Sequence, residues 1–294
     1  MKIIRYNTLL DELIPEGREI HKLASGYSFA EGPVWCSRTN QLYFTDFPNH
    51  HIHTWSEADG ARLYKEQSGR AIGLALDAEG RLLQCESLAR RISRIEADGA
   101  VAALATHYQG KRLNNTNDVI VKKDGTIYFS DPYSAMLGDS RDLDYNGVFR
   151  YRPATGAVDL LVGDFERPNG LAFSPDESLL YINDTNKQHI KVYDTAPDGT
   201  VNPEGRIFAE MDAAMGPGAA DGMKTDERGN VYVTGPGGIW IYAPSGEHLG
   251  RIELPEVAAN LCFGSGAGSQ RNDILYITAS TSLYSVRLDV CGAM

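Results

Sequence analysis

Short runs of apolar and aromatic residues recur along the chain at intervals of about 40 to 50 residues, each behind a turn signal such as Asp124-Gly125 or Arg228-Gly229. Six runs align: Leu42–Asp46, Leu82–Glu86, Ile127–Asp131, Leu180–Asp184, Val231–Gly235 and Leu275–Ala279. A second run follows in each copy: Ile52–Trp55, Ile92–Ile95, Val148–Tyr151, Ile190–Tyr193, Ile239–Tyr242 and Leu283–Val286. Apolar runs of this length between turns predict antiparallel β-strands.

Repeats of this size with three or four strands are typical of a β-propeller, so six copies predict an all-β, six-bladed β-propeller. The sixth copy ends near Leu288 and leaves no room for a fourth strand. We expect Ile20–Leu23 to supply that strand and close the ring, which removes exposed sheet edges. The chain shows no linker, so we expect one domain over residues 1–294. Its short N-terminal extension, residues 1–18, has a helical turn at Thr8–Leu13 as its nearest helix candidate.

Polar residues occupy the same phase of four repeats, just before the first strand. They are Glu31, Asn117, Asn169 and Asp221. The first strand of a propeller blade lines the central channel, so equal phase places these side chains around one end of the axis. The complete pre-strand ring is Glu31, Ile72, Asn117, Asn169, Asp221 and Asn260.

The pre-strand ring contains oxygen ligands and no His or Cys, which is the ligand set of Ca²⁺, Mg²⁺ or Mn²⁺. Carboxylates gathered at one opening would also repel one another without a cation among them. The alternative is that Asn and Asp mark turns and accept backbone donors. That explains one such residue well, but four at one phase favour a cation site.

A second set of acidic residues ends the second strands and lies at the same end of each blade, because the two strands are antiparallel. This strand-end ring is Asp46, Glu86, Asp131 and Asp184. Thr-Asp and Ser-Asp at a strand end commonly fix a turn, so we expect structural roles here. Asp184 is the member expected to support a metal ligand.

Charge and cysteine usage narrow the possible partners. A formal net charge of −11 argues against nucleic-acid binding. No segment approaches the roughly 20 apolar residues that span a bilayer, and the N-terminus lacks a signal-peptide pattern. The four cysteines are scattered and are predicted to be free thiols. We therefore expect a cytoplasmic protein without a membrane partner.

The sequence has no GxSxG, HExxH or GxxxxGK[ST] motif that would supply a competing nucleophile or site. Its histidines show no ligand spacing, and His50, His51 and His53 are expected at the surface or rim. A divalent ion at a channel mouth can polarise a carbonyl or phosphoryl oxygen and lower the pKa of bound water. The residues thus suggest metal-assisted hydrolysis, with a carboxylate such as Asp221 assisting proton transfer.

Several motifs resemble those of the gluconolactonase, senescence-marker and luciferin-regenerating family of six-bladed propellers, over about Ala30 to Leu288. They are Ala30–Trp35, Arg112–Val119, Ser130–Tyr133, Pro168–Ala172, Asp221–Met223, Gly235–Trp240 and Tyr276–Ser280. The resemblance implies hydrolysis of a sugar lactone, such as a glucono- or pentonolactone, to the aldonic acid. It implies one divalent metal ion, which could be Ca, Mn, Mg, Zn or Fe(II).

The resemblance also implies roles for individual residues. Glu31, Asn169 and Asp221 match the metal ligands, and Asp221 also matches the general base. Asn117 is either a fourth ligand or a contact to substrate.

Two positions depart from the family pattern. The senescence-marker branch has Arg where this chain has Asn115, and gluconolactonase-like members often have His where it has Ser87. Substrate selection is therefore the least transferable property. Candidate substrate contacts at the rim, each of which could instead pack a loop, are Phe47, Glu86, Arg91, Asn115, Tyr133 and Asn260.

Two other functions compete with a sugar lactonase. Related propellers use a similar Glu/Asn/Asn/Asp site on phosphorus substrates, so a phosphotriesterase or other ester hydrolase is the alternative within hydrolases. A non-catalytic binding scaffold would be expected to have a broken polar ring or a face of exposed aromatics. The intact ring argues against that reading.

Overall fold

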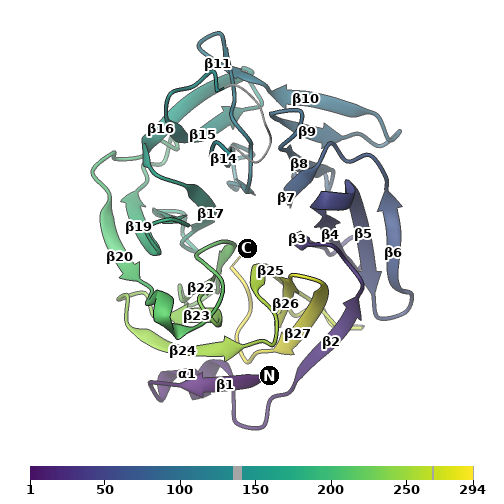
Figure 1. Cartoon of the computed structure of the whole chain (residues 1–294), viewed down its shortest axis with the longest axis vertical. Helices are drawn as coiled ribbons and strands as arrows, with labels where there is room; N and C mark the ends of the chain where they lie inside the picture. Colours follow the sequence, from purple (N-terminus) through teal and green to yellow (C-terminus); the bar gives the residue numbers. More distant parts are fainter. Residues whose placement is uncertain (135–140, 267, 294) are drawn as a thin grey trace.

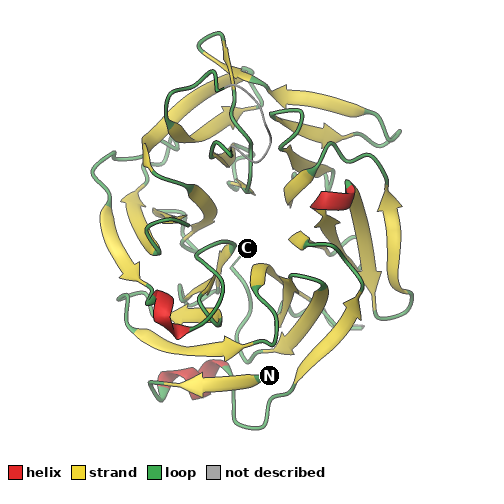
Figure 2. Ribbon diagram, viewed as in Figure 1, coloured by secondary structure: helices red, strands yellow, loops and turns green. Residues whose placement is uncertain are grey.

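Six β-sheets stand around a central axis in the computed structural model, which describes residues 1–134, 141–266 and 268–293 (Figure 1). Figure 2 shows that strands dominate and that helices are short. Blade one consists of β3 (Ala30–Cys36), β4 (Gln41–Asp46), β5 (His51–Ser56) and β6 (Gly60–Lys65). Blade two consists of β7 (Ala71–Leu76), β8 (Leu82–Glu86), β9 (Arg91–Ile95) and β10 (Val101–Ala105). Blades three and four are β13 (Val119–Val121), β14 (Ile127–Asp131), β15 (Asn146–Arg152), β16 (Ala157–Phe165), and β17 (Pro168–Phe173), β18 (Leu179–Asp184), β19 (His189–Asp194), β20 (Arg206–Glu210).

Blade five consists of β21 (Met223–Thr225), β22 (Val231–Gly235), β23 (Gly238–Tyr242) and β24 (His248–Glu253). Blade six consists of β25 (Ala258–Gly264), β26 (Ile274–Ala279), β27 (Ser282–Arg287) and β2 (Ile20–Ser25). Outside the blades lie a ribbon of β11 (His107–Tyr108) and β12 (Lys111–Arg112), and two 3₁₀ turns, Phe47–Asn49 and Ala213–Met215. The predicted six-bladed propeller is confirmed, and each predicted second and third strand is present.

The ring closes as predicted, because β2 pairs antiparallel with β27 and places Ile20 opposite Val286. Figure 1 shows this junction where the purple N-terminal strand lies beside the yellow C-terminal blade. The first and last parts of the chain are therefore held in one sheet. Every blade then has two blades as neighbours, and neither end of the ring is left as an open edge.

Aromatic side chains fill the space between blades. Trp35 of blade one stacks on Tyr276 of blade six with ring centroids 5.4 Å apart. Tyr232 of blade five meets Phe263 of blade six edge-on at 5.3 Å. Strand β22 is buried along its whole length, as the continuous apolar run of its sequence predicts. Packing between blades, rather than one central core, therefore holds the propeller together.

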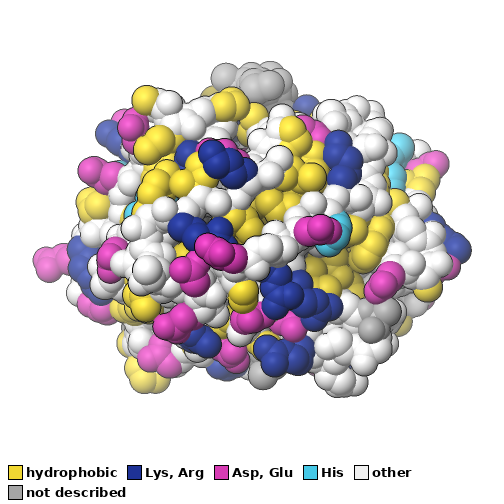
Figure 3. All heavy atoms as spheres, turned by 90° about the horizontal axis from the view of Figure 1, so that it is seen from below, with side chains coloured by type: hydrophobic (Ala, Val, Ile, Leu, Met, Phe, Trp, Pro, Cys, Tyr) yellow, Lys and Arg dark blue, Asp and Glu magenta, His cyan; other side chains and the backbone are white. Residues whose placement is uncertain are grey.

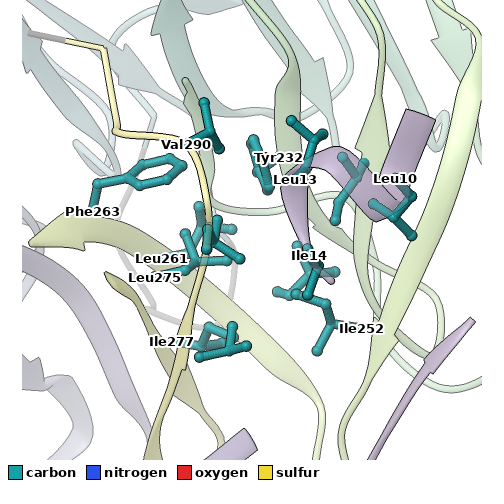
Figure 4. Close-up of a cluster of buried hydrophobic side chains, with 14 of the residues drawn as sticks. Leu10, Leu13, Ile14, Tyr232, Ile252, Leu261, Phe263, Leu275, Ile277 and Val290 are labelled. Atoms are coloured by element: carbon teal, nitrogen blue, oxygen red, sulfur yellow. The ribbon is translucent and has the colours of Figure 1, made fainter. Parts of the chain in front are cut away.

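The N-terminal extension packs closely on the ring. Strand β1 (Lys2–Arg5) pairs with β24 as a fifth strand of blade five, which the sequence pattern did not predict. Helix α1 (Leu9–Leu13) is the predicted helical turn, and its Leu10 and Leu13 are buried. Figure 4 shows these side chains and Ile14 facing Ile252 and other apolar residues of blades five and six.

Acidic and basic side chains are interspersed on the side of the ring seen in Figure 3. All four cysteines are free, and Cys36, Cys85 and Cys262 are buried, which confirms that prediction. In the described part of the chain, no helix is long and apolar enough to cross a membrane.

The helix α1 offers a matched test of how much the N-terminal segment contributes. Leu10 is fully buried, whereas its neighbour Leu9 is 45% exposed. Leu10→Ala should lower the free energy of unfolding by about 2 to 5 kcal/mol, since it leaves a cavity against blade five. Leu9→Ala should change it by less than about 0.5 kcal/mol. Urea unfolding of both variants measures the difference, and equal values would show that α1 does not stabilise the ring.

Candidate active site

The first strands of neighbouring blades approach one another backbone to backbone at the pre-strand ring. A Cβ atom added to Gly73 would lie 2.6 Å from the carbonyl oxygen of Asn117, and one added to Gly170 would collide with the carbonyl oxygen of Asp221. Gly32 is likewise pressed against the carbonyl of Ile72. Glycine thus follows the ring residue where blades meet most closely. The close contact fixes where each ring side chain begins.

A cavity of about 170 Å³ lies at this end of the channel. It is lined by five pre-strand residues, Glu31, Ile72, Asn117, Asn169 and Asp221. Further out its wall contains Phe29, Phe47, Arg70, Ser87, Asn115, Pro132, Ser134 and Arg167. The four predicted metal-ligand positions are therefore brought to one cavity.

A larger cavity of about 300 Å³ opens at the other end of the channel. Its wall is formed mainly by aliphatic residues of the first strands, with Lys224 and Glu177 among the few charged ones. It lacks the convergent polar groups expected of a reacting site. The smaller, polar cavity is therefore the candidate active site.

Glu31 is held in place by two donors to one carboxylate oxygen. Its Oε2 accepts from the Gly32 backbone N–H at 2.6 Å and from Asn260 Nδ2 at 3.0 Å. Burial raises the pKa of Glu31 to about 7, and the Asp118 carboxylate adds to the rise. Asn260 itself does not line the cavity. It acts on the site by holding Glu31.

Asp221 reaches the cavity from the loop before β21. Burial raises the pKa of Asp221 well above its usual range, and the nearby carboxylates of Glu31 and Asp118 raise it further. Arg167 and Asn169 act in the opposite direction. The fold thus holds carboxyl groups so close together that they resist ionising at the same time. A bound cation would favour their ionised forms and lower their pKa values again.

Asn169 presents an unsatisfied oxygen. Its Nδ2 donates to Thr185 Oγ1 at 3.0 Å, and that hydroxyl donates to the Ala220 carbonyl at 2.8 Å. The amide is therefore oriented with Oδ1 left over, and this buried atom has no hydrogen-bond partner. Buried polar atoms are normally paired, so an unpaired oxygen beside carboxyl groups suits the coordination of a divalent cation.

A cation here would rely on amides as well as acids. Among the described residues, no group of three or more His, Cys, Asp and Glu side chains is placed to hold a metal ion. The predicted set, Glu31, Asn117, Asn169 and Asp221, has only two carboxylates. Its donors are hard oxygens, which suit a divalent ion such as Ca²⁺, Mg²⁺ or Mn²⁺.

The other predicted substrate contacts lie in different places. Asn115 lines the cavity, but its Nδ2 donates to the Ser87 carbonyl at 3.1 Å and its Oδ1 accepts from the Ser134 N–H at 2.9 Å. Its amide therefore supports the wall. Glu86, Arg91 and Tyr133 are not among the described residues that line the cavity. Arg91 donates to both oxygens of Glu86 at 3.0 Å.

Strand-end acids mostly organise the loops. Asp46 accepts from the backbone of Phe29 at 3.0 Å and from Asn49 Nδ2 at 2.8 Å. Asp131 accepts from the Asn114 N–H at 2.7 Å. Asp184 accepts from the backbone of four residues: Glu166, Arg167, Asn186 and Lys187. It therefore fixes the loop that leads into Asn169.

Three charged residues at or beside the site were not predicted from the sequence. Arg70 and Arg167 line the cavity, and Asp118 lies next to Asn117 with its Oδ2 buried and without a hydrogen-bond partner. The repeat contains a pattern that could have identified all three. Both arginines stand two residues before a pre-strand position, and Asp118 occupies the phase at which most other blades have glycine.

The structure is a β-propeller with carboxylate and amide oxygens gathered at one mouth of its channel. Proteins of this class can bind a small polar ligand at such a site. The model of the SMP-30/Gluconolactonase/LRE-like region matches residues 29–281. The chain belongs to this family.

Relatives match nearly the whole chain in sequence or in fold. A gluconolactonase from Zymomonas mobilis is 31% identical over 317 residues, which cover 99% of this chain and 87% of that protein. The structure of a gluconolactonase from Xanthomonas campestris, 28% identical, matches with a TM-score of 0.89 over 98% of this chain and 95% of that one. A luciferin-regenerating enzyme, 21% identical, shares the fold with a TM-score of 0.77 over 94% of this chain and 99% of its own.

The raised pKa of Glu31 predicts how pH affects cation binding. Without metal, its pKa of about 7 exceeds the ordinary 4.5, so the folded state holds a proton that the unfolded state has lost between these values. Stability of the metal-free protein should therefore fall as pH rises through this window. A divalent ion must displace that proton, and any proton held by Asp221, so its affinity should weaken by at least about tenfold per pH unit below 7.

Thermal unfolding with and without CaCl₂ or MnCl₂ measures this effect. The metal-induced rise in Tm should be larger at pH 8 than at pH 5.5. Glu31→Gln removes one of the two titrating carboxyl groups and should reduce the difference. An equal rise at both pH values in the wild type would contradict a ligand role for Glu31.

Asp46→Asn tests whether strand-end acids are structural. It keeps one acceptor oxygen for Phe29 but places an NH₂ donor opposite the Ser28 N–H and Asn49 Nδ2, which should lower stability by about 1 kcal/mol. Metal affinity, measured by calorimetric titration, should change little. Unchanged stability together with lost metal binding would mean that the strand-end ring, and not the pre-strand ring, holds the cation.

Proposed function

We propose that the protein hydrolyses a sugar lactone, an aldonolactone such as a glucono- or pentonolactone, to the aldonic acid at the 170 Å³ cavity. The unpartnered Asn169 Oδ1, in a residue that shares a cavity with Glu31 and Asp221, carries this proposal. Family membership and the gluconolactonase relatives support it.

Glu31, Asn169 and Asp221 would hold one divalent metal ion, and Asn117 would complete the set or contact the substrate. When bound, that ion would polarise the lactone carbonyl and acidify the attacking water. Ca, Mn, Mg, Zn and Fe(II) remain the candidates. The hydrogen bonds from Asn260 and Gly32 keep Glu31 fixed, so little reorganisation is needed on binding.

Asp221 would move the proton in this reaction. Water adds to the carbonyl carbon while Asp221 accepts its proton, and the ring C–O bond then breaks. The same carboxyl group returns the proton to the departing ring oxygen, which becomes a hydroxyl group. The open-chain aldonic acid is therefore the only product.

The wall of the cavity supports this reaction by limiting water. Phe29, Phe47, Ile72 and Pro132 provide apolar surface beside the polar ring. Exclusion of bulk water strengthens the electrostatic interactions of the carboxylates with a bound cation. The same surface can contact the carbon face of a sugar ring.

Replacement of ring residues tests the proposal. Asp221→Asn and Glu31→Gln should each reduce bound metal well below one equivalent and lower kcat/KM for aldonolactones by about 100-fold or more. Asn169→Ala should weaken metal binding less, since a neutral oxygen contributes less Coulomb attraction. The exposed Glu16→Gln, which removes a carboxylate far from the cavity, is the control.

Metal analysis and acid release from a lactone panel measure these effects. Spontaneous hydrolysis must be subtracted. A phosphotriester belongs in the panel, and preference for it would replace the lactonase proposal with the alternative hydrolase. Full metal occupancy in Glu31→Gln would refute the ligand assignment, and no turnover of any substrate by metal-loaded wild type would favour a binding scaffold.

A further inference from the structure

The repeat that defines the pre-strand ring also defines a second ring outside it. The first strands run from the polar cavity toward the larger one, so residues two before each pre-strand position lie on its mouth side. This outer ring is Phe29, Arg70, Asn115, Arg167, Ala219 and Ala258. Its first four members line the cavity. The mouth thus has cationic side chains at blades two and four, and small alanine side chains stand at the same phase of blades five and six.

Arg70 is held in an unusual backbone conformation. Its φ is 61°, in the left-handed region that residues other than glycine seldom adopt. The Ser87 hydroxyl donates to its carbonyl oxygen at 2.9 Å, and its guanidinium lies 5.6 Å from the centroid of the Phe47 ring. Its Nε is buried and has no hydrogen-bond partner. A conformation that costs free energy and leaves a donor unsatisfied indicates a functional constraint.

Arg167 is held from its backbone as well. Its N–H donates to Asp184 Oδ1 at 3.2 Å, and its carbonyl accepts from the Thr185 N–H at 3.0 Å. The side chain is exposed at the mouth and lines the cavity. Within residues 1–134, 141–266 and 268–293, neither Arg167 nor Arg70 forms an ion pair with a carboxylate. By contrast, Arg91 near the same mouth is paired with Glu86.

We propose that the substrate lactone carries an anionic group, a phosphate, sulfonate or carboxylate, at the end remote from its carbonyl, and that Arg70 and Arg167 bind it. This inference rests on the lactonase function proposed above. The pre-strand ring would receive the carbonyl end, so the remote substituent would lie toward the outer ring. A guanidinium binds such oxyanions through paired, charge-assisted hydrogen bonds. The site would then combine a deep acidic ring with a basic mouth.

The first experiment compares a hexonolactone bearing a C6 phosphate with the unsubstituted lactone. Wild-type kcat/KM should be at least tenfold higher for the phosphorylated lactone, mostly through a lower KM. Arg70→Gln and Arg167→Gln should each reduce the ratio of the two kcat/KM values at least tenfold. Arg167→Lys keeps the charge and should recover part of the ratio. Arg62→Gln, which removes an exposed arginine on the outer strand β6, should leave the ratio unchanged.

The second experiment measures binding without turnover. The C6-phosphorylated aldonic acid should raise the Tm of the wild type more than the unsubstituted aldonic acid does, and Arg167→Gln should abolish that difference. The C6-sulfonated and C6-carboxylated acids identify which anion is preferred. Because Arg167 is exposed, its variants should remain folded even if Arg70→Gln does not.

The outcomes separate this inference from the proposed function. Efficient turnover of the neutral lactone with no preference for the anionic one would overturn the inference and leave the lactonase proposal intact. An equal loss for both lactones in Arg167→Gln would also overturn it, since Arg167 would then act on Asp221. If neither lactone is hydrolysed, the binding experiment alone decides whether the arginines recognise the anion.

Discussion

The close approach of the first strands around the axis is the constraint on which the rest of the structure depends. Gly73 and Gly170 allow each strand start to contact the carbonyl of the next blade's ring residue, where a larger residue would clash. The Gly73 N–H donates to the Asn117 carbonyl at 2.8 Å, which joins two blades directly. Ring side chains therefore begin from fixed points, and ring closure by β2 keeps those points together.

The fold was predictable because its pattern is repeated six times. Apolar runs at a constant spacing identified the strands, and the missing fourth strand of the last copy identified Ile20–Leu23 as its replacement. Strand β1 and the packing of Leu10 were not predictable in this way. They belong to no repeat, and a segment as short as Lys2–Arg5 is too brief to show a periodicity that distinguishes it from a loop.

The site was predictable only as far as repeat phase determines position. Phase brought Glu31, Asn117, Asn169 and Asp221 to one cavity, as the structure places them. Repeat phase could not show which of these side chains would form hydrogen bonds or ion pairs with neighbouring residues. Glu86 is paired with Arg91 and the Asn115 amide is bound by the chain backbone, and both interactions depend on loop conformations that the repeat does not encode.

The site also explains a tension between stability and function in this fold. Burial raises the pKa of Glu31, Asp118 and Asp221. The Asp118 charge raises the pKa of Glu31 further, and both raise that of Asp221, so ionising all three costs stability when no cation is present. Packing between blades must outweigh that cost, since it holds the ring whether or not the acids are neutralised. Arg167 lowers the pKa of Asp221, but burial and the neighbouring carboxylates outweigh it. A ring that is rigid in backbone and whose charge is only partly compensated by Arg167 and Lys224 is therefore suited to capture a cation without rearranging.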